Sequence, residues 1–112
     1  MEISLQGYNN KYVTMRVKSG ANVGDSMDIV ENNTSAKAAD QKAPIGKLVS
    51  QNGEYGLIQT TGAMEFKYSD KPELGYTAIS SDGKGGIKPD DNGRFVIVTE
   101  INETESTALI VM

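Results

Sequence analysis

The chain has 112 residues, a net charge of −4 and no cysteine or histidine. Without cysteine there are no disulfides, thiolate metal sites or cysteine nucleophiles. Without histidine the Ser-His-Asp triad and most zinc sites are excluded. The length indicates one domain, the lack of a basic cluster disfavours nucleic-acid binding, and no apolar stretch is long enough to span a membrane.

Twelve glycines separate short runs of β-branched and apolar residues, a pattern typical of an all-β sandwich or barrel. Apolar and polar residues alternate over residues 12–17, and a short apolar run covers residues 27–30, so both segments are predicted strands. Residues 32–43 are rich in Ala, Lys and Asp and end at Pro44. Because they lack an apolar stripe, a surface loop with at most one helical turn is expected there.

Asn52-Gly53 lies between the apolar runs 45–50 and 55–60, which is a strong hairpin signal. Over residues 63–68 apolar residues alternate with Glu65 and Lys67, so one face of a strand should be buried and the other wet. A further short strand is predicted over residues 76–80, and residues 87–89 are expected only to bridge to the next turn.

Residues 94–101 and 105–112 read as two strands that are apolar at neighbouring positions, which predicts burial on both faces. The last strand should hold the end of the chain in the sheet. The predicted fold is therefore all-β, a small β-barrel with short hairpins and at most one short helical turn. Residues 1–11 are predicted to form an N-terminal arm, and residues 12–112 a single β domain.

Two glycine-containing turns resemble ligand loops, and neither fits its motif. Asp82-Gly83-Lys84-Gly85-Gly86 suggests a phosphate cradle, but the lysine precedes the last glycines and no helix can follow, so a flexible turn is expected. Residues 90–93, Asp-Asp-Asn-Gly, suggest a calcium loop, but the glycine comes two residues early. A hairpin turn is the better interpretation.

No catalytic constellation stands out, so the protein is predicted not to be an enzyme and to need no cofactor or metal. Asp25 and Asp28 are expected to mark a solvated edge, and nothing selects a pair of carboxylates for acid-base chemistry. Tyr68 and Tyr76 fall near strand ends and are expected to pack at the edge of the core. The alternative is that tyrosines line a face that binds sugar or peptide.

Residues 75–112 combine a Gly-Tyr-Thr step, a Gly-Gly-Ile turn, a Gly-Arg step and a closing apolar strand. This part of the chain resembles the end of small head-decoration (capsid cement) proteins of tailed phages and prophages of Gram-positive bacteria. Residues 17–33 are similar to the early turn-strand segment of those proteins, and residues 43–68 to their central hairpin segment. The resemblance covers most of the chain from Tyr12 onward and consists of turn and core patterns.

The resemblance implies a β-barrel or β-tulip-like domain that binds and stabilises the outside of the expanded head, with the major capsid protein as its partner. It also implies a homotrimer or clusters on the capsid, synthesis in the cytoplasm of the host bacterium, and no nucleic-acid or membrane partner. Because N-terminal arms often grip the capsid in this family, the resemblance suggests capsid contacts for Met1, Glu2, Ile3, Leu5, Tyr8 and Lys11.

Two other functions remain open from the residues. The first is a small β binding module of phage origin that recognises carbohydrate or another tail or surface ligand. The second is a biotinyl- or lipoyl-like carrier domain, suggested by the cadence of residues 17–25. Carrier domains modify a lysine at a hairpin tip, and the Asp70-Lys71 pair, followed directly by Pro72, does not match that context.

Overall fold

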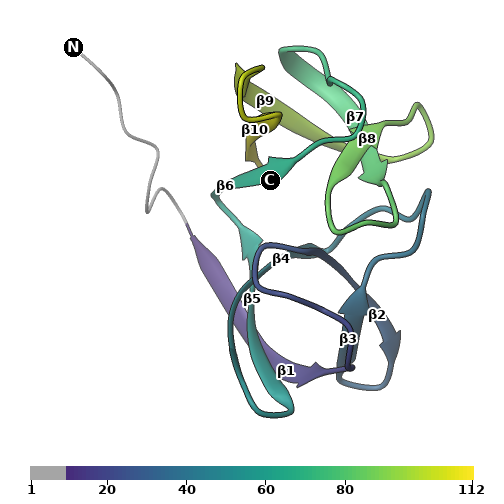
Figure 1. Cartoon of the computed structure of the whole chain (residues 1–112), viewed down its shortest axis with the longest axis vertical. Coiled ribbons are helices and arrows are strands. Elements are labelled where there is room, and N and C mark those ends of the chain that lie inside the picture. Colours follow the sequence, from purple (N-terminus) through teal and green to yellow (C-terminus); the bar gives the residue numbers. More distant parts are fainter. Residues whose placement is uncertain (1–9) are drawn as a thin grey trace.

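A computed structural model describes residues 10–112, which form ten β-strands and no helix. The predicted all-β class is therefore confirmed. Five strands close a barrel and the other five form a second sheet, which lies above the barrel in Figure 1. The strands are β1 (Lys11–Val17), β2 (Ser26–Glu31), β3 (Thr34–Lys37), β4 (Gly46–Asn52), β5 (Tyr55–Thr61), β6 (Ala63–Lys67), β7 (Gly75–Ser81), β8 (Ile87–Pro89), β9 (Arg94–Asn102) and β10 (Thr107–Val111).

The barrel has the strand order β1-β3-β2-β4-β5 and closes through antiparallel pairing of β1 with β5. Successive side chains of a strand point to opposite faces, so alternate residues of the barrel strands point inward. Val17, Met27, Leu48 and Ile58 meet there and are buried. A small apolar core therefore lies inside the barrel.

The prediction of a surface loop over residues 32–43 is wrong for the first part of that range, because Thr34–Lys37 forms β3. Asn32 and Asn33 make the turn from β2, and Asn33 has a φ of 54°, a left-handed conformation that asparagine tolerates better than most residues. β3 pairs with both β1 and β2, and its Thr34 and Ser35 are buried. Pairing on both sides outweighs the weak strand preference of its alanine and lysine.

The predicted hairpin of β4 and β5 is confirmed. Asn52 pairs with Tyr55, and Gly53 and Glu54 form the two-residue turn between them. Gly53 has a φ of 63° and Glu54 does not have a positive φ, as in a turn with glycine at the first central position. The glycine of the Asn-Gly pair therefore sets the turn.

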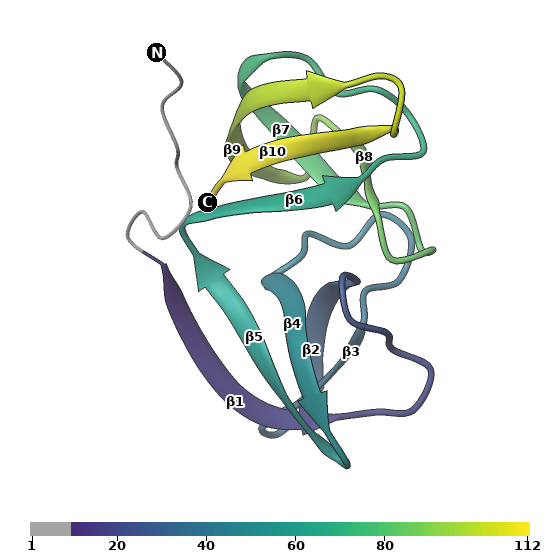
Figure 2. The same ribbon diagram turned by 60° about the vertical axis from the view of Figure 1, so that its left-hand side comes forward.

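The chain passes from the barrel to the second sheet at Gly62, where β5 leads directly into β6 (Figure 2). Gly62 has a φ of 108°, a conformation that favours glycine. It also exchanges two backbone hydrogen bonds with Met112, of 3.1 and 3.0 Å. The prediction that the last strand is held in the sheet is thus confirmed.

The second sheet has the order β6-β10-β9-β7-β8, and its inner face forms the larger apolar core. On β6, Met64 and Phe66 are buried while Glu65 and Lys67 are exposed, which confirms the predicted alternation. The core is made of buried apolar residues from all five strands: Met64, Phe66, Ile79, Ile87, Val96, Val98, Ala108 and Ile110.

Residues 87–89, expected only as a bridge, form strand β8, which pairs with β7. β9 pairs with the other side of β7, so the turn at residues 90–93 crosses the end of β7 and joins two strands that are not neighbours. The hairpin predicted there is wrong. Gly93 lies so close to the carbonyl of Ile79 that a side chain at this position would collide with it, which explains the glycine.

The prediction of burial on both faces is wrong for β9. Val96 and Val98 are each 2% exposed on the inner face, whereas Phe95 and Ile97 are 55% and 46% exposed on the outer face. The prediction fits β10 better, because its outer residues Leu109 and Val111 are both half buried. The apolar residues of β9 match the sequence pattern of a strand that is buried on both faces. However, no segment among residues 10–112 covers the outer face of β9.

Buried serines join the barrel to the second sheet. Ser26 of β2 donates its hydroxyl to the carbonyl of Gly86 at 2.9 Å, and Ser81 of β7 donates to the carbonyl of Ala38 at 2.9 Å. Both serines are fully buried. Because buried polar groups are stable only when hydrogen-bonded, these contacts fix how the two halves meet.

Candidate functional site

The outer face of the second sheet carries large apolar side chains on neighbouring strands. Tyr76 of β7, which is 74% exposed, lies opposite Ile97 of β9, and Val111 of β10 flanks Ile97 on the other side. Phe95 lies opposite the small Ala78. We call Tyr76, Phe95, Ile97 and Val111 the apolar face.

Two aromatic rings form the most exposed part of the apolar face. The centroids of Tyr76 and Phe95 are 5.0 Å apart, and the ring planes are inclined by 30°. This spacing lies in the favourable range for aromatic pairs. The packing expected of Tyr68 is confirmed, since it packs against the sheet core, but the same expectation for Tyr76 is wrong.

Acidic groups border this region. Glu65, Glu100 and Thr107 line a small polar groove on the β6, β10 and β9 strands. Beyond it, the Lys71 ammonium lies 2.6 Å from the Glu103 carboxylate. The hydrogen bond and charge of Lys71 lower the pKa of Glu103, and the same contact with Glu103 raises the pKa of Lys71. A partner of the apolar face would therefore meet an apolar centre with charged surroundings.

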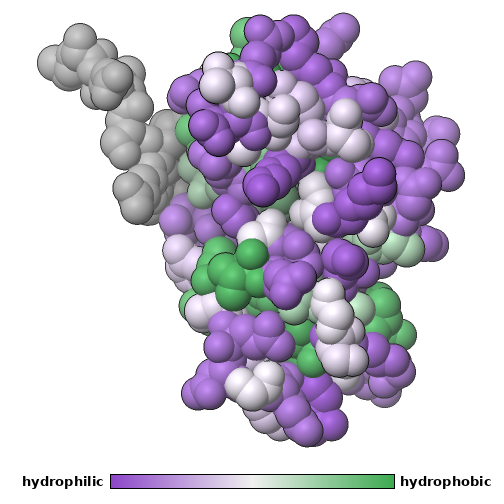
Figure 3. Space-filling model, in the orientation of Figure 1, coloured by the Kyte–Doolittle hydropathy of each residue, from purple (hydrophilic) through white to green (hydrophobic). Residues whose placement is uncertain are grey.

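The barrel exposes apolar residues in a different arrangement. In the view of Figure 3 the upper part, which holds the second sheet, is largely hydrophilic, and hydrophobic residues gather over the barrel. Tyr55, the aromatic residue at the tip of the β4–β5 hairpin, is covered by the Arg16 guanidinium, 5.8 Å from its ring centroid. The large exposed apolar residues of the barrel half are Tyr12, Val13, Val23, Ile29, Val30 and Tyr55.

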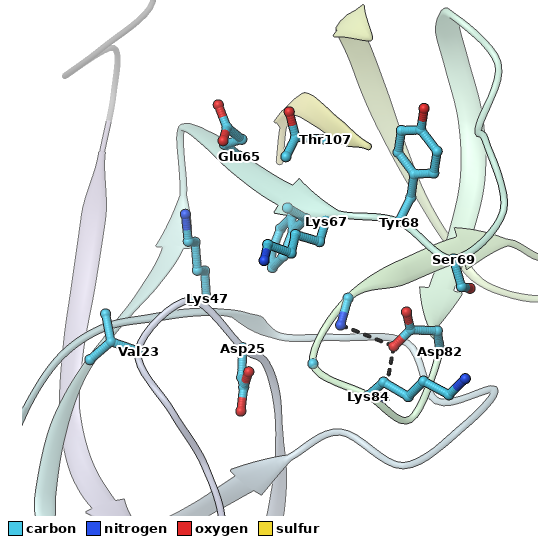
Figure 4. Close-up of a pocket in the computed structure, with 14 residues that line it drawn as sticks. Val23, Asp25, Lys47, Glu65, Lys67, Tyr68, Ser69, Asp82, Lys84 and Thr107 are labelled. Atoms are coloured by element: carbon cyan, nitrogen blue, oxygen red, sulfur yellow. Dashed lines mark hydrogen bonds between the residues drawn. The ribbon is translucent and has the colours of Figure 1, made fainter. Parts of the chain in front are cut away.

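A cleft of about 500 Å³ lies where the barrel meets the second sheet (Figure 4). β6 forms one side, and β4 with the loop before β2 forms the other. Lys47 and Lys67 point into the space between them. We call this the junction cleft; its lining residues are Val23, Gly24, Asp25, Lys47, Glu65, Phe66, Lys67, Tyr68, Ser69, Asp82, Lys84, Gly85, Gly86 and Thr107.

The loop that resembles a phosphate cradle forms one end of the junction cleft. Asp82 accepts hydrogen bonds from the N–H groups of Lys84 at 2.8 Å and Gly86 at 3.0 Å, so these donors already have an anionic partner. Gly83 and Gly85 have φ values of 77° and 93°, which confirms the turn interpretation. The loop is thus closed around its own aspartate.

Lys47 lies on the β4 side of the junction cleft, and its side chain is half buried. Burial of its side chain lowers the pKa, and the nearby Glu65 carboxylate partly opposes that effect. The ammonium lies 6.0 Å from the centroid of the Phe66 ring, at the limit of a cation–π contact. Lys47 is therefore a partly desolvated cation at the edge of the sheet core.

Among residues 10–112 no three histidine, cysteine or carboxylate side chains group as a metal site. The side chains of Asp25 and Asp28 accept hydrogen bonds from the backbone N–H groups of Asn22 and Ile29. In the turn at residues 90–93, the backbone N–H of Asn92 holds the pKa of Asp90 below its ordinary value. Nor does any described segment form an apolar helix long enough to cross a membrane.

Most of the predicted capsid-contact residues, Met1, Glu2, Ile3, Leu5 and Tyr8, lie outside the described part of the chain. Lys11 does not belong to an arm: it is the first residue of β1 and pairs with Thr61. The sequence pattern assigns Phe95, Ile97 and Val111 to the core and so misses them as a site, whereas Tyr76 belongs to the alternative of a tyrosine-lined binding face. The signal that could have revealed the apolar face is the aromatic residue at the polar-facing position of the strand beginning at Gly75.

The sequence matches no protein-family model and no curated protein. Function is therefore inferred from the apolar face and from the resemblance of the sequence to capsid decoration proteins.

Proposed function

We propose that this protein is a non-catalytic decoration protein that binds the outer surface of the expanded head of a tailed bacteriophage, with the major capsid protein as its partner. The observation that carries the proposal is the apolar face, in which Tyr76, Phe95 and Ile97 remain exposed on an otherwise well-formed sheet. The sequence resemblance across residues 17–33, 43–68 and 75–112 supplies the class of partner.

Burial against a partner would stabilise a complex through the apolar face. Removing apolar surface from water stabilises a complex by about 25 cal/mol per Å². The three most exposed side chains leave roughly 350 Å² open, a size that marks functional patches on small proteins. Tyr76 and Phe95 already contact each other, and this contact reduces the side-chain entropy that is lost on binding.

The size of the apolar face also argues against a stable dimer in solution. A standard protein–protein interface buries about 800 Å² on each partner, of which roughly 450 Å² is apolar, and this exceeds the apolar area that the apolar face exposes. We therefore expect a monomer in solution that collects in trimers or other clusters when the capsid lattice brings copies together.

A weak contact per copy is sufficient for head stabilisation. A protein that binds only the expanded lattice stabilises it by RT ln(1 + [L]/Kd) per site. Contacts that bridge neighbouring capsid subunits gain further from multivalency. The decoration protein thereby holds the expanded shell together against the pressure of packaged DNA, and its place in the virion is the outer surface of the head.

A carbohydrate-binding module is the second candidate, favoured by the exposed Tyr76–Phe95 pair. Aromatic rings present an apolar body with a polar tip, which suits sugar as well as protein. The geometry around Lys71 does not support the carrier-domain alternative. Lys71 lies between β6 and β7, which are not paired with each other, and it forms an ion pair with Glu103.

Co-sedimentation with phage heads tests the proposal. Purified protein is mixed with expanded empty heads of the phage that encodes it, and unexpanded proheads serve as the control. We expect saturable binding to expanded heads alone, with a stoichiometry that identifies the symmetry axis. Absence of binding well above micromolar concentration, together with binding on a glycan array, would replace decoration by the carbohydrate function.

A further inference from the structure

Strand β6 borders the junction cleft with an unpaired edge. It pairs with β10 on one side only, and across the junction cleft from it lie β4 and the loop before β2. An edge strand presents a row of backbone donors and acceptors to which another chain can add as a strand. This edge is therefore a place where a peptide could bind.

The register shows which backbone groups face the junction cleft. The N–H of Tyr68 donates to the carbonyl of Ser106 at 3.0 Å, on the β10 side of the strand. Residues in an antiparallel ladder alternate between hydrogen-bonded and non-hydrogen-bonded pairs. Glu65, which alternates with Tyr68, consequently directs its N–H and carbonyl groups away from β10 and toward the junction cleft. Lys67 also points its backbone groups away from β10, but Gly86 packs against its carbonyl.

Both ends of this edge are closed, and its centre is open. At one end the side-chain amide of Gln59 donates to the carbonyl of Ala63 at 3.0 Å. At the other end Tyr68 forms a bridge with Ile87 of β8. Glu65 lies between these closures and pairs with no strand other than β10 within residues 10–112.

The side chains around the open edge favour an acidic ligand. Lys47 and Lys67 have no ion-pair partner within 4.0 Å among the described residues, and Lys47 is partly desolvated. The carboxylates of Asp25 and Asp82, by contrast, already accept backbone hydrogen bonds. The third carboxylate of the lining, Glu65, lies near Lys47 but forms no ion pair within 4.0 Å among the described residues, so the ammonium groups of Lys47 and Lys67 keep free donors for a carboxylate.

We propose that the junction cleft binds an extended acidic segment of a partner protein, which adds as a strand to the β6 edge at Glu65 and places its carboxylates against Lys47 and Lys67. The volume of about 500 Å³ lies within the range of ligand pockets. Backbone hydrogen bonds to the edge would give affinity, and the two lysines would select acidic side chains. The site shares no residue with the apolar face and does not depend on the proposed function.

The test is a titration of the ¹⁵N-labelled full chain with the peptide acetyl-EVEVE-amide, followed by amide chemical shifts. We expect saturable shifts centred on the amides of Glu65 and Lys67, and none with acetyl-KVKVK-amide. No shifts at millimolar peptide, or equal shifts with the lysine peptide, would overturn the proposal. Equal shifts with sodium glutamate at matched carboxylate concentration would also overturn it, since the site would then bind anions without strand addition.

Two variants separate charge from strand addition. Lys47→Met keeps the apolar stem and should weaken peptide binding about tenfold, the size of a lost charged hydrogen bond. Lys37→Met, at an exposed lysine of β3, is the matched control and should leave binding unchanged. Equal affinities for these two variants would contradict the role of Lys47.

The backbone contact is tested at Glu65, whose N–H does not bond to β10. Glu65→Pro removes that N–H without breaking the β6–β10 ladder and should abolish binding, while Glu65→Ala should retain it. Circular dichroism checks that the proline variant folds. If it does not, a peptide N-methylated at every residue is used with the unmodified protein. Full binding of the proline variant, or of the N-methylated peptide, would rule out strand addition.

Discussion

The two faces of the second sheet carry similar apolar residues, which form the core on the inner face and stay exposed on the outer face. On β9, Val96 and Val98 point into the core and are each 2% exposed, while Phe95 and Ile97, which alternate with them, point outward and are about half exposed. All four are strongly hydrophobic, so hydrophobicity alone does not separate residues that hold the fold from residues available for binding. The face of the sheet on which a residue lies decides which of the two roles it has. Substitutions on the inner face should therefore lower stability, and substitutions on the outer face should lower binding.

The largest expected effect is on the inner face. Phe66→Ala should lower the free energy of unfolding by about 3–5 kcal/mol, because Phe66 is fully buried and its removal leaves a cavity. Phe95→Ala on the outer face should cost about 1 kcal/mol, mainly the loss of its contact with Tyr76. Urea unfolding of both variants measures the difference, and losses of similar size would show that the outer face is part of the fold.

Substitutions at the junction between barrel and sheet should lower stability, as substitutions on the inner face do. A Cβ at Gly86 would lie 2.5 Å from the carbonyl oxygen of Lys67, so Gly86→Ala should cost about 2–3 kcal/mol through overpacking. Gly20 has a φ of 99° but open space around it, so Gly20→Ala should cost about 1 kcal/mol from backbone strain alone. Thermal unfolding ranks the two variants, and the reverse order would mean that the junction is loosely packed.

Strand positions and turns could be predicted from the sequence to the extent that they depend on local pattern. Alternation over residues 63–68 correctly placed Phe66 inside and Glu65 outside, and Gly53 correctly marked the β4–β5 hairpin. Strand β3 could not be predicted in this way. Its residues favour a strand only because β1 and β2 pair with it on both sides.

The candidate sites depend on which strands are neighbours, and local pattern does not contain that information. The apolar face exists because β7 lies next to β9, which brings Tyr76 to Phe95. The junction cleft exists because β6 is at an edge and faces Lys47 of the barrel. The resemblance to decoration proteins predicts capsid contacts within residues 1–11. Apart from Lys11, which lies in β1, these contacts stay predictions.

A smaller effect is expected at the ion pair near the outer face. Lys71 and Glu103 are both largely exposed, so Glu103→Gln should lower the melting temperature only slightly, and only at low salt. The lowered pKa of Glu103 and raised pKa of Lys71 mean that the contribution is fully present between about pH 4.5 and 10.5. It is lost as the pH falls through the lowered pKa or rises through the raised one. A salt-independent loss would contradict this assignment.

The most direct test of the account is to measure stability and head binding on the same variant of the apolar face. Tyr76→Ser with Phe95→Ser should change the free energy of unfolding by no more than about 1.5 kcal/mol, yet remove co-sedimentation with expanded heads. Val30→Ser, at an exposed barrel position, is the matched control and should bind as the unmodified protein does. Full binding by the Tyr76/Phe95 variant, with its fold intact, would contradict the claim that the apolar face is the surface that meets the capsid.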